Sequence, residues 1–236
     1  MAGFSELADG LMYYVVFLFS TTLHEAAHAW AAQRGGDLTA YHGGQVSLSP
    51  VPHIRREPFG MVILPLLSVV ATGWPFGFAS APYDPKWARQ YPRRAGMMAL
   101  AGPASNLLLV LIAAVLIRIG LASGLFYPPD SITFGKIIGT AGDGLWPAAA
   151  FMLGVVFSLN LLLAIFNMLP FPPLDGSGAL PLILPAGLTR RYQDFVWGNP
   201  IVGLLGLFLA WQIFGPVFQP LFVAAVSLLH PGVSYN

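Results

Sequence analysis

The sequence of 236 residues contains no cysteine, and its charged residues are scarce. Without cysteine there are no disulfides, no thiolate catalysis and no cysteine-ligated metals, so histidine and carboxylate side chains have to hold any metal ion. Charged residues make up 9% of the chain, against about 25% in ordinary soluble domains. A soluble domain covers its surface with charge to remain monomeric, whereas 56% of this chain is hydrophobic. The composition therefore argues against a free-standing soluble protein.

Basic residues are few as well. Eleven Lys and Arg stand against ten Asp and Glu, which gives a formal net charge of +1. Nucleic-acid binding depends on clustered Lys and Arg that displace counterions, and this chain has no long basic run. We therefore expect no nucleic-acid partner.

Long apolar runs take the place of charge in this sequence. A helix crosses a hydrocarbon core of about 30 Å with roughly 20 residues. Four segments reach this length, at residues 11–33, 95–117, 146–169 and 200–230. The first lacks the basic start and early cleavage site of a signal peptide, so we expect it to be retained. The last has two prolines in its middle, which leaves open one kinked helix or two half-spans.

A fifth apolar segment, residues 59–79, is interrupted by prolines and glycines. A single crossing here would place the basic residues before and after it on opposite sides, against the positive-inside bias. A re-entrant segment or a full helical hairpin instead keeps nine basic residues on the inside, leaving the N-terminus outside: Arg34, Arg55, Arg56, Lys86, Arg89, Arg93, Arg94, Arg190 and Arg191. The sequence thus predicts an all-α polytopic membrane protein, a bundle of about 4–6 transmembrane helices with a re-entrant or hairpin segment.

Two carboxylates lie where lipid is expected. Eight of the ten acidic residues fall in connecting segments or termini, but Glu25 lies inside the first apolar run. Asp175 is the only charge between residues 144 and 189. A charge at bilayer depth costs on the order of 3 kcal/mol or more, so both residues are candidates for function.

Glu25 belongs to the pattern His24-Glu25-Ala26-Ala27-His28. On a helix, positions i and i+4 share a face, so both imidazoles can reach one metal ion while Glu25 flanks it and reaches its water. The alternative is a set of polar side chains that only hydrogen-bond within the bundle. That alternative leaves three desolvated polar groups unexplained, so the pattern favours a metal site.

A catalytic zinc site usually has three protein ligands and one open position. Asp175 is the candidate for the third ligand, because it follows the proline-rich run at residues 167–174 that ends the third apolar segment. Irregular backbone at membrane depth is tolerated only where it is buried in protein or lines a wet cavity. A helix stop or N-cap in an ordinary interfacial loop is the alternative reading of this aspartate.

These residues resemble the site-2 protease family of intramembrane zinc metalloproteases, peptidase M50, in its small bacterial and archaeal members. Besides residues 24–28, three segments carry the resemblance: residues 167–176 resemble the N-x-x-P-x-x-x-L-D-G pattern, residues 102–106 the G-P-x-x-N helix, and residues 75–79 a P-F-G-x-A turn. The resemblance covers residues 11 to about 195. It implies a zinc site in the membrane, near the cytoplasmic face, that hydrolyses a peptide bond in a transmembrane segment of a protein substrate.

The resemblance also implies roles for individual residues. His24, His28 and Asp175 would hold one zinc ion, and Glu25 would be the general base. Asn167 matches a position that orients the substrate or the developing oxyanion.

Two stretches depart from the family pattern. Residues 80–83 replace a lysine-containing stretch, and residues 55–57 stand where a simple acidic turn is common. Neither departure touches the ligands, so both bear on substrate preference rather than on catalysis.

We expect residues 1–236 to form one integral-membrane metalloprotease domain, without a PDZ or CBS module. Its catalytic core would lie at about residues 11–180 and a C-terminal helical segment at about residues 195–230. The expected partners are the lipid bilayer and a transmembrane protein substrate. The expected location is the cell (inner) membrane of a prokaryote.

Weaker patterns give further expectations. Residues 43–51 alternate like a short strand and predict a membrane-associated β-hairpin, either an edge for an extended substrate or an ordinary interfacial hairpin. We expect His42 and His53 to be solvated loop residues rather than to have an auxiliary metal or gating role, and we expect His230 to lie at the membrane interface. Asn106 favours a hydrogen bond across helices over contact with substrate.

Two other functions would use the same residues. One is a membrane zinc carrier or sensor without hydrolysis, and the other is a catalytically silent helper with the same fold. Glu25 discriminates against the carrier, since transport has no stated need for a base beside two histidines. The intact ligand set and base argue against the helper.

Overall fold

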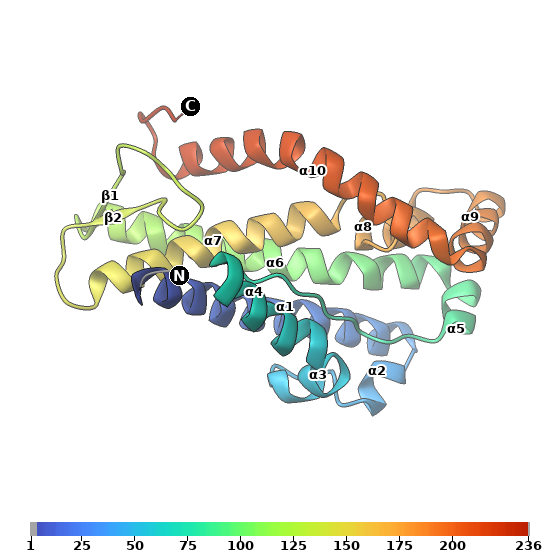
Figure 1. Cartoon of the computed structure of the whole chain (residues 1–236). Helices are drawn as coiled ribbons and strands as arrows, with labels where there is room; N and C mark the ends of the chain where they lie inside the picture. The colour runs from blue at the N-terminus through green and yellow to red at the C-terminus, as the bar shows by residue number, and fades with distance from the viewer. Residues whose placement is uncertain (1–3, 236) are drawn as a thin grey trace.

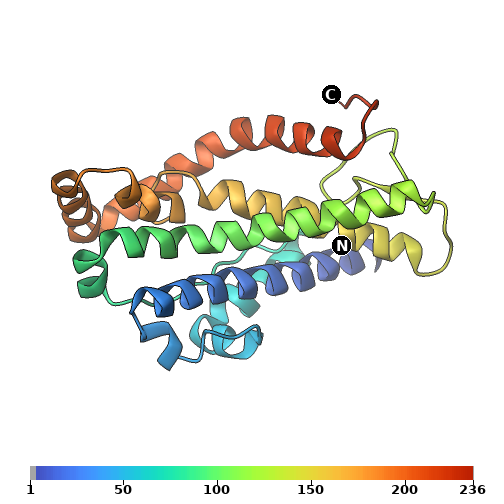
Figure 2. The same ribbon diagram turned by 180° about the vertical axis from the view of Figure 1, so that it is seen from behind.

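The computed structural model describes residues 4–235 and consists mostly of helices (Figure 1). Four long helices dominate: α1 (Phe4–Gly35), α6 (Pro92–Ala122), α7 (Trp146–Asn167) and α10 (Pro200–Leu229). Seen from both sides, α1, α6 and α7 lie together, and α10 runs along the outside of this group (Figures 1 and 2). The shorter elements are α2 (Thr39–His42), α3 (Pro50–Arg56), η1 (Phe59–Ile63), α4 (Leu64–Thr72), α5 (Pro85–Gln90), β1 (Phe126–Tyr127), β2 (Gly139–Thr140), α8 (Asp175–Ala179), η2 (Leu180–Leu182) and α9 (Ala186–Gly198). The predicted all-α class is confirmed.

Within residues 4–235, three helices are long and apolar enough to cross a membrane, namely α6, α7 and α10, with mean hydropathies of 2.3, 2.4 and 2.0. The predicted first span, residues 11–33, lies inside α1, whose C-terminal half holds the polar residues of the His-Glu-x-x-His pattern. α10 is one helix with Pro216 and Pro220 in its interior, so two separate half-spans are not formed. The total of 4–6 spans stays a prediction.

Apolar side chains hold the long helices in register. Val16 and Phe17 of α1 pack with Val155 and Leu159 of α7. A larger cluster joins α6, α7 and α10 and includes Ile117, which is completely buried. Burial of this apolar surface fixes the face of α1 that is turned toward α6 and α7.

Residues 59–79 form a helix that turns back as an extended chain. η1 and α4, of 5 and 9 residues, span about 21 Å at about 1.5 Å per residue, short of a hydrocarbon core of about 30 Å. Gly73 adopts a left-handed conformation with φ 75°, and the chain then returns beside the helix, where Phe78 N donates to Gly60 O over 3.1 Å. The full helical hairpin is therefore not formed. The re-entrant position in a membrane stays a prediction.

The strand predicted at residues 43–51 is wrong. Ser49 Oγ accepts a hydrogen bond from Val51 N and caps α3, and Pro50 occupies the first turn of that helix. Proline is favoured at the start of a helix and cannot donate to a strand ladder, so helix formation prevails here. The two-stranded antiparallel sheet of the protein lies elsewhere and pairs β1 with β2.

Elements that carry seven of the nine basic residues gather at one end of the bundle: the C-terminus of α1 with Arg34, α5 with Lys86 and Arg89, the start of α6 with Arg93 and Arg94, and α9 with Arg190 and Arg191. α5 and α9 lie at this end, α3 with Arg55 and Arg56 lies along the side of the bundle, and β1, β2 and the start of α1 lie at the opposite end (Figure 1). The predicted topology makes this end cytoplasmic, and that placement stays a prediction.

The absence of cysteine makes this topology testable with single introduced thiols. Leu48, between α2 and α3, and Leu145, before α7, are 73% and 85% exposed. In sealed right-side-out vesicles, we expect a membrane-impermeant maleimide to label the Leu145→Cys variant directly and the Leu48→Cys variant only after permeabilisation. Labelling of both variants from the outside would contradict the topology.

Candidate metal centre

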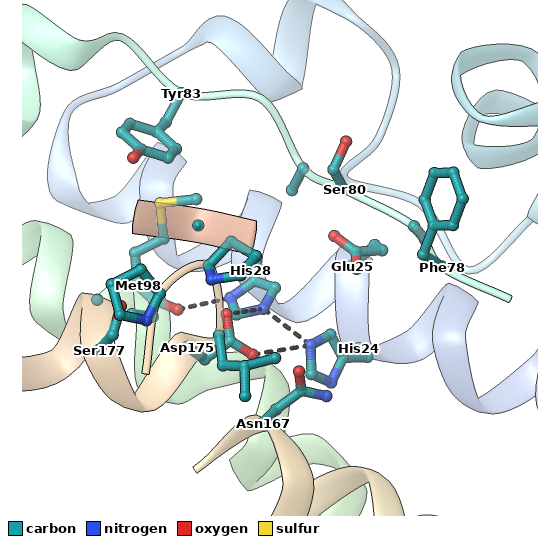
Figure 3. Close-up of a pocket in the computed structure, with 18 of the residues that line it drawn as sticks. His24, Glu25, His28, Phe78, Ser80, Tyr83, Met98, Asn167, Asp175 and Ser177 are labelled. Atoms are coloured by element: carbon teal, nitrogen blue, oxygen red, sulfur yellow. Dashed lines mark hydrogen bonds and ion pairs between the residues drawn. The ribbon is translucent and has the colours of Figure 1, made fainter. Parts of the chain in front are cut away.

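The four-residue spacing of His24 and His28 places both imidazoles on one face of α1, one turn apart. Both side chains are buried. The two Nε2 atoms point toward each other at a distance of 3.0 Å (Figure 3). Local helix geometry is therefore enough to bring together two of the three predicted donors.

Asp175 completes this group from a distant part of the chain. It is the first residue of α8, and its carboxylate oxygens lie 3.1 Å from His24 Nε2 and 3.3 Å from His28 Nε2 (Figure 3). Gly176 permits this approach, because a Cβ at this position would overlap the carbonyl group of Met168. The structure thus brings together the three residues that the sequence predicts as ligands.

α8 is also held from the other side. Tyr192 of α9 donates its hydroxyl proton to Ser177 O over 3.1 Å. Burial raises the pKa of Tyr192 above its ordinary value, so the phenol stays protonated and remains a donor. The position of the Asp175 carboxylate therefore depends on α9 as well as on α7.

Hydrogen bonds on the far side of each imidazole decide where its proton lies. His28 Nδ1 donates to the backbone oxygen of Met98 over 2.7 Å, and His24 Nδ1 donates to Oδ1 of Asn106 over 2.6 Å. Both partner atoms are acceptors, so each neutral ring carries its proton on Nδ1 and a lone pair on Nε2. Both lone pairs are then available on the side that faces Asp175.

With both rings in this neutral form, electron-pair donors converge without protons between them. Asp175 Oδ2 is buried and faces His24 Nε2 over 3.1 Å, where the neutral ring offers it no proton. Lone pairs and carboxylate oxygens 3.0–3.3 Å apart repel one another in a buried site unless a cation lies between them. Ligand atoms at zinc–ligand distances of 2.0–2.1 Å in a tetrahedral arrangement lie about 3.3 Å apart. Two imidazoles and one carboxylate therefore fit a zinc ion.

Gly102 of α6 contacts both imidazoles. A Cβ at this position would overlap the Nε2 atoms of His24 and His28. Only glycine lets the backbone of α6 come this close to the donor atoms. The G-P-x-x-N segment noted in the sequence therefore has a physical function here that the sequence alone did not reveal.

The donor group faces a cavity of about 890 Å³. Glu25 lies in its wall next to the histidines, on the side of Phe78 and Ser80 (Figure 3). Asn167, at the end of α7, also lines this cavity, and its Nδ2 donates to Leu163 O over 3.0 Å. The cavity is lined by parts of α1, α6, α7, α8, α9, α10 and the extended segment 77–83.

Polar side chains that sequence reasoning missed hold the extended segment 77–83 over the cavity. Gln45 Nε2 and Arg56 Nε each donate to Ser80 O over 3.2 Å, and Ser80 Oγ donates to Glu57 Oε1 over 2.6 Å. Asp37 fixes the end of the segment by accepting from Asp84 N over 2.9 Å. The Arg55–Glu57 departure from the family pattern is therefore part of the structure that supports one wall of the cavity.

The other predicted histidine positions are partly wrong. His42 is exposed, as expected, but His53 is only 1% exposed because α3 folds it inward, where Nε2 donates to Ser47 O over 3.0 Å. His230 caps the C-terminus of α10 and is buried, and its Nε2 donates to Ile137 O over 2.8 Å; its place at the membrane interface stays a prediction. Asn106 bonds across helices, as predicted.

The chain is a helical membrane-type bundle with a buried His-Glu-x-x-His segment. An aspartate lies beside the two histidines, and a cavity adjoins this group. These features together are typical of a membrane metallopeptidase. Comparison with known proteins agrees, since residues 12–207 match the family described as peptidase family M50. This match covers most of the chain, and the chain belongs to this family. It is an integral membrane protein of the metallopeptidase class.

Curated relatives carry names of the same kind. The chain is 31% identical over 231 residues to "Putative zinc metalloprotease YwhC" of Bacillus subtilis, covering 89% of this chain and 95% of the relative. It is 32% identical over 212 residues to "Putative zinc metalloprotease Rip2" of Mycobacterium tuberculosis strain H37Rv, covering 88% and 70%. The archaeal "Putative zinc metalloprotease MJ0611" of Methanocaldococcus jannaschii is 30% identical over 123 residues, covering 51% and 47%. No solved structure matches the chain significantly.

The close approach of Gly102 predicts a strong effect of a single methyl group. We expect Gly102→Ala to weaken zinc binding by about 100-fold, because the methyl group displaces the two Nε2 atoms. This is the upper end of the 10- to 100-fold loss of metal affinity that follows from changing residues that support metal ligands. The measurement is zinc affinity of the purified chain, by competition with a chromogenic chelator.

Gly215→Ala is the matched control. Gly215 also precedes a proline in a long apolar helix, but no atom of the described residues lies within 4 Å of a Cβ there. We expect this variant to bind zinc like the wild type. Equal affinities of the two variants would contradict the packing of Gly102 on the donors.

Proposed function

We propose that this protein is an intramembrane zinc endopeptidase of the site-2 protease type, which hydrolyses peptide bonds within or near transmembrane segments of other membrane proteins. The observation that carries the proposal is the convergence of His24, His28 and Asp175 beside the cavity that Glu25 lines. Membership of peptidase family M50 and the names of the relatives support it.

One zinc ion would be held by His24 Nε2, His28 Nε2 and the Asp175 carboxylate. When bound, zinc supplies a Lewis acid that lowers the pKa of water and polarises a carbonyl group. Three protein donors leave one position for water or substrate, as in catalytic rather than structural zinc sites.

Glu25 is the proposed general base. It follows His24 directly, so the same helix that presents the two imidazoles places this carboxylate at the edge of the donor group. Its carboxylate takes a proton from the attacking water and passes it to the leaving amide nitrogen. This role needs an ionised carboxylate within reach of both atoms. Asn167, in the wall of the same cavity, is proposed to orient the substrate or the developing oxyanion.

The substrate has to be extended where it is cut, because a helix buries its carbonyl groups in i to i+4 hydrogen bonds. Part of α10, a long helix with many exposed apolar side chains, borders the cavity at Pro200, Gly203 and Leu207. An apolar boundary of this kind suits the entry of an unwound transmembrane segment. The partners are accordingly a transmembrane protein substrate and the lipid bilayer.

The proposed location is a prokaryotic cell membrane, with the site near the cytoplasmic face. Bacterial and archaeal relatives and the gathering of basic residues at the end that holds α5 and α9 support this placement. The same end contributes α9 to the wall of the cavity.

Replacing Glu25 by glutamine separates catalysis from metal binding. We expect Glu25→Gln to keep its zinc, because Glu25 is not one of the three donors, and to lose cleavage by about 10²- to 10⁴-fold, the usual contribution of a general base. The measurement is cleavage of single-span reporter proteins reconstituted with the full chain, together with zinc content.

Glu6→Gln is the control, since Glu6 lies on the same helix at its exposed N-terminal end. It should retain both zinc and cleavage. Cleavage by Glu25→Gln at the wild-type rate would contradict the assignment of Glu25 as general base. Stoichiometric zinc with no cleavage by the wild type of any reporter would favour the carrier or silent-helper alternatives.

A further inference from the structure

A chain of buried amide side chains leads from α7 to the first histidine. Asn160 of α7, Asn106 of α6 and Ser20 of α1 are each completely buried, with 0% exposure. Asn106 Nδ2 donates to Asn160 Oδ1 over 2.8 Å, and Asn160 Nδ2 donates to Ser20 Oγ over 2.9 Å. Three helices of the bundle therefore meet in one polar network beside His24.

The direction of this network is fixed at its α7 end. Asn160 Nδ2 also donates to the backbone oxygen of Val156 over 2.8 Å. A backbone oxygen only accepts, so the amide of Asn160 has to turn its nitrogen toward Val156 and its oxygen toward Asn106. An amide that lacked this anchor could adopt either of two orientations.

The orientation passes along the chain of hydrogen bonds to the imidazole. Because Asn160 presents an oxygen, Asn106 has to present its nitrogen to Asn160 and its oxygen to His24. His24 then carries its proton on Nδ1 and its lone pair on Nε2, the atom that faces Asp175. The reverse orientation of Asn106 would place an N–H opposite Nδ1 and favour a proton on Nε2.

His28 needs no such network. Its Nδ1 donates directly to the backbone oxygen of Met98, which has one orientation only. The two histidines are therefore prepared for the same task by different means, one by backbone and one by two amide side chains.

We infer that Asn160 and Asn106 are positioning residues that hold His24 in its metal-binding tautomer, with Asn160 acting through Asn106. The inference rests on the proposed function, because it takes His24 as a zinc ligand. It gives a role to Asn106, the asparagine of the G-P-x-x-N segment, and to Asn160, which lies outside the motifs noted in the sequence. Partners of this kind behind metal-bound histidines typically change metal affinity by 10- to 100-fold.

The test measures zinc affinity of the metal-stripped full chain in detergent micelles, by competition with a chromogenic chelator. We expect Asn160→Leu, which has nearly the same shape, to weaken zinc binding by about 10- to 100-fold. Ser158→Ala is the matched control, because Ser158 is a fully buried residue of the same helix whose Oγ has no partner among the described residues. It should bind zinc like the wild type.

The decisive comparison repeats Asn160→Leu in the Asn106→Asp background. Aspartate has oxygens on both sides and keeps the acceptor for His24 in either orientation, so Asn160→Leu should cause no further loss there. A loss of the same size in both backgrounds, or in neither, would overturn the inference. Wild-type zinc affinity in Asn160→Leu would overturn it while leaving the proposed function intact, whereas a wild-type chain that binds no zinc would overturn both.

A second test, a double-mutant cycle with leucine at both positions, avoids the buried charge that Asn106→Asp introduces. Asn106→Leu and Asn160→Leu should each weaken zinc binding, and the double variant should be no weaker than Asn106→Leu alone. Losses that multiply would show that Asn160 acts independently and would contradict the inference. Thermal unfolding of the metal-free variants, compared with Ser158→Ala, separates a change in zinc affinity from a general loss of stability.

Discussion

The repulsion among unprotonated donors at the centre of the bundle is the constraint on which the rest of the structure depends. His24 and His28 each give their ring proton to an acceptor on the far side, so two lone pairs and the Asp175 carboxylate face one another at 3.0–3.3 Å. Such a group is stable in a buried site only when a metal ion or a proton lies among the donors. The surrounding elements have to hold the donors there against that repulsion.

Each neighbouring element contributes one part of this restraint. α6 supplies both acceptors and the bare backbone of Gly102, and α8 carries Asp175 up to the imidazoles because Gly176 permits its close approach to α7. α7 fixes the amide of Asn106 through Asn160. The apolar contacts of α1 with α7 set the rotation of α1 that makes these contacts possible. Stability of the bundle and geometry of the site therefore arise from the same helix packing.

The sequence predicted what depends on local periodicity and on the cost of charge in lipid. The spacing of His24 and His28 and the isolation of Asp175 in an apolar region were sufficient to predict their grouping. Contacts that depend on tertiary packing were not accessible. Asn160 is one polar residue in an apolar helix, and its partners Asn106 and Ser20 are 54 and 140 residues away. The prediction of a strand at residues 43–51 was wrong because the helix start at Pro50 outweighed the alternation of apolar and polar residues. The prediction for His53 was wrong because the sequence pattern does not show that α3 turns this side chain inward.

The main chemical prediction of the structure is that His24, His28 and Asp175 hold a single zinc ion. Zinc content of the purified full chain, combined with X-ray absorption at the zinc edge, tests it most directly. We expect one zinc ion per chain with imidazole and carboxylate donors, and loss of that zinc in Asp175→Ala. A chain without stoichiometric zinc, or Asp175→Ala with an unchanged zinc spectrum, would contradict it.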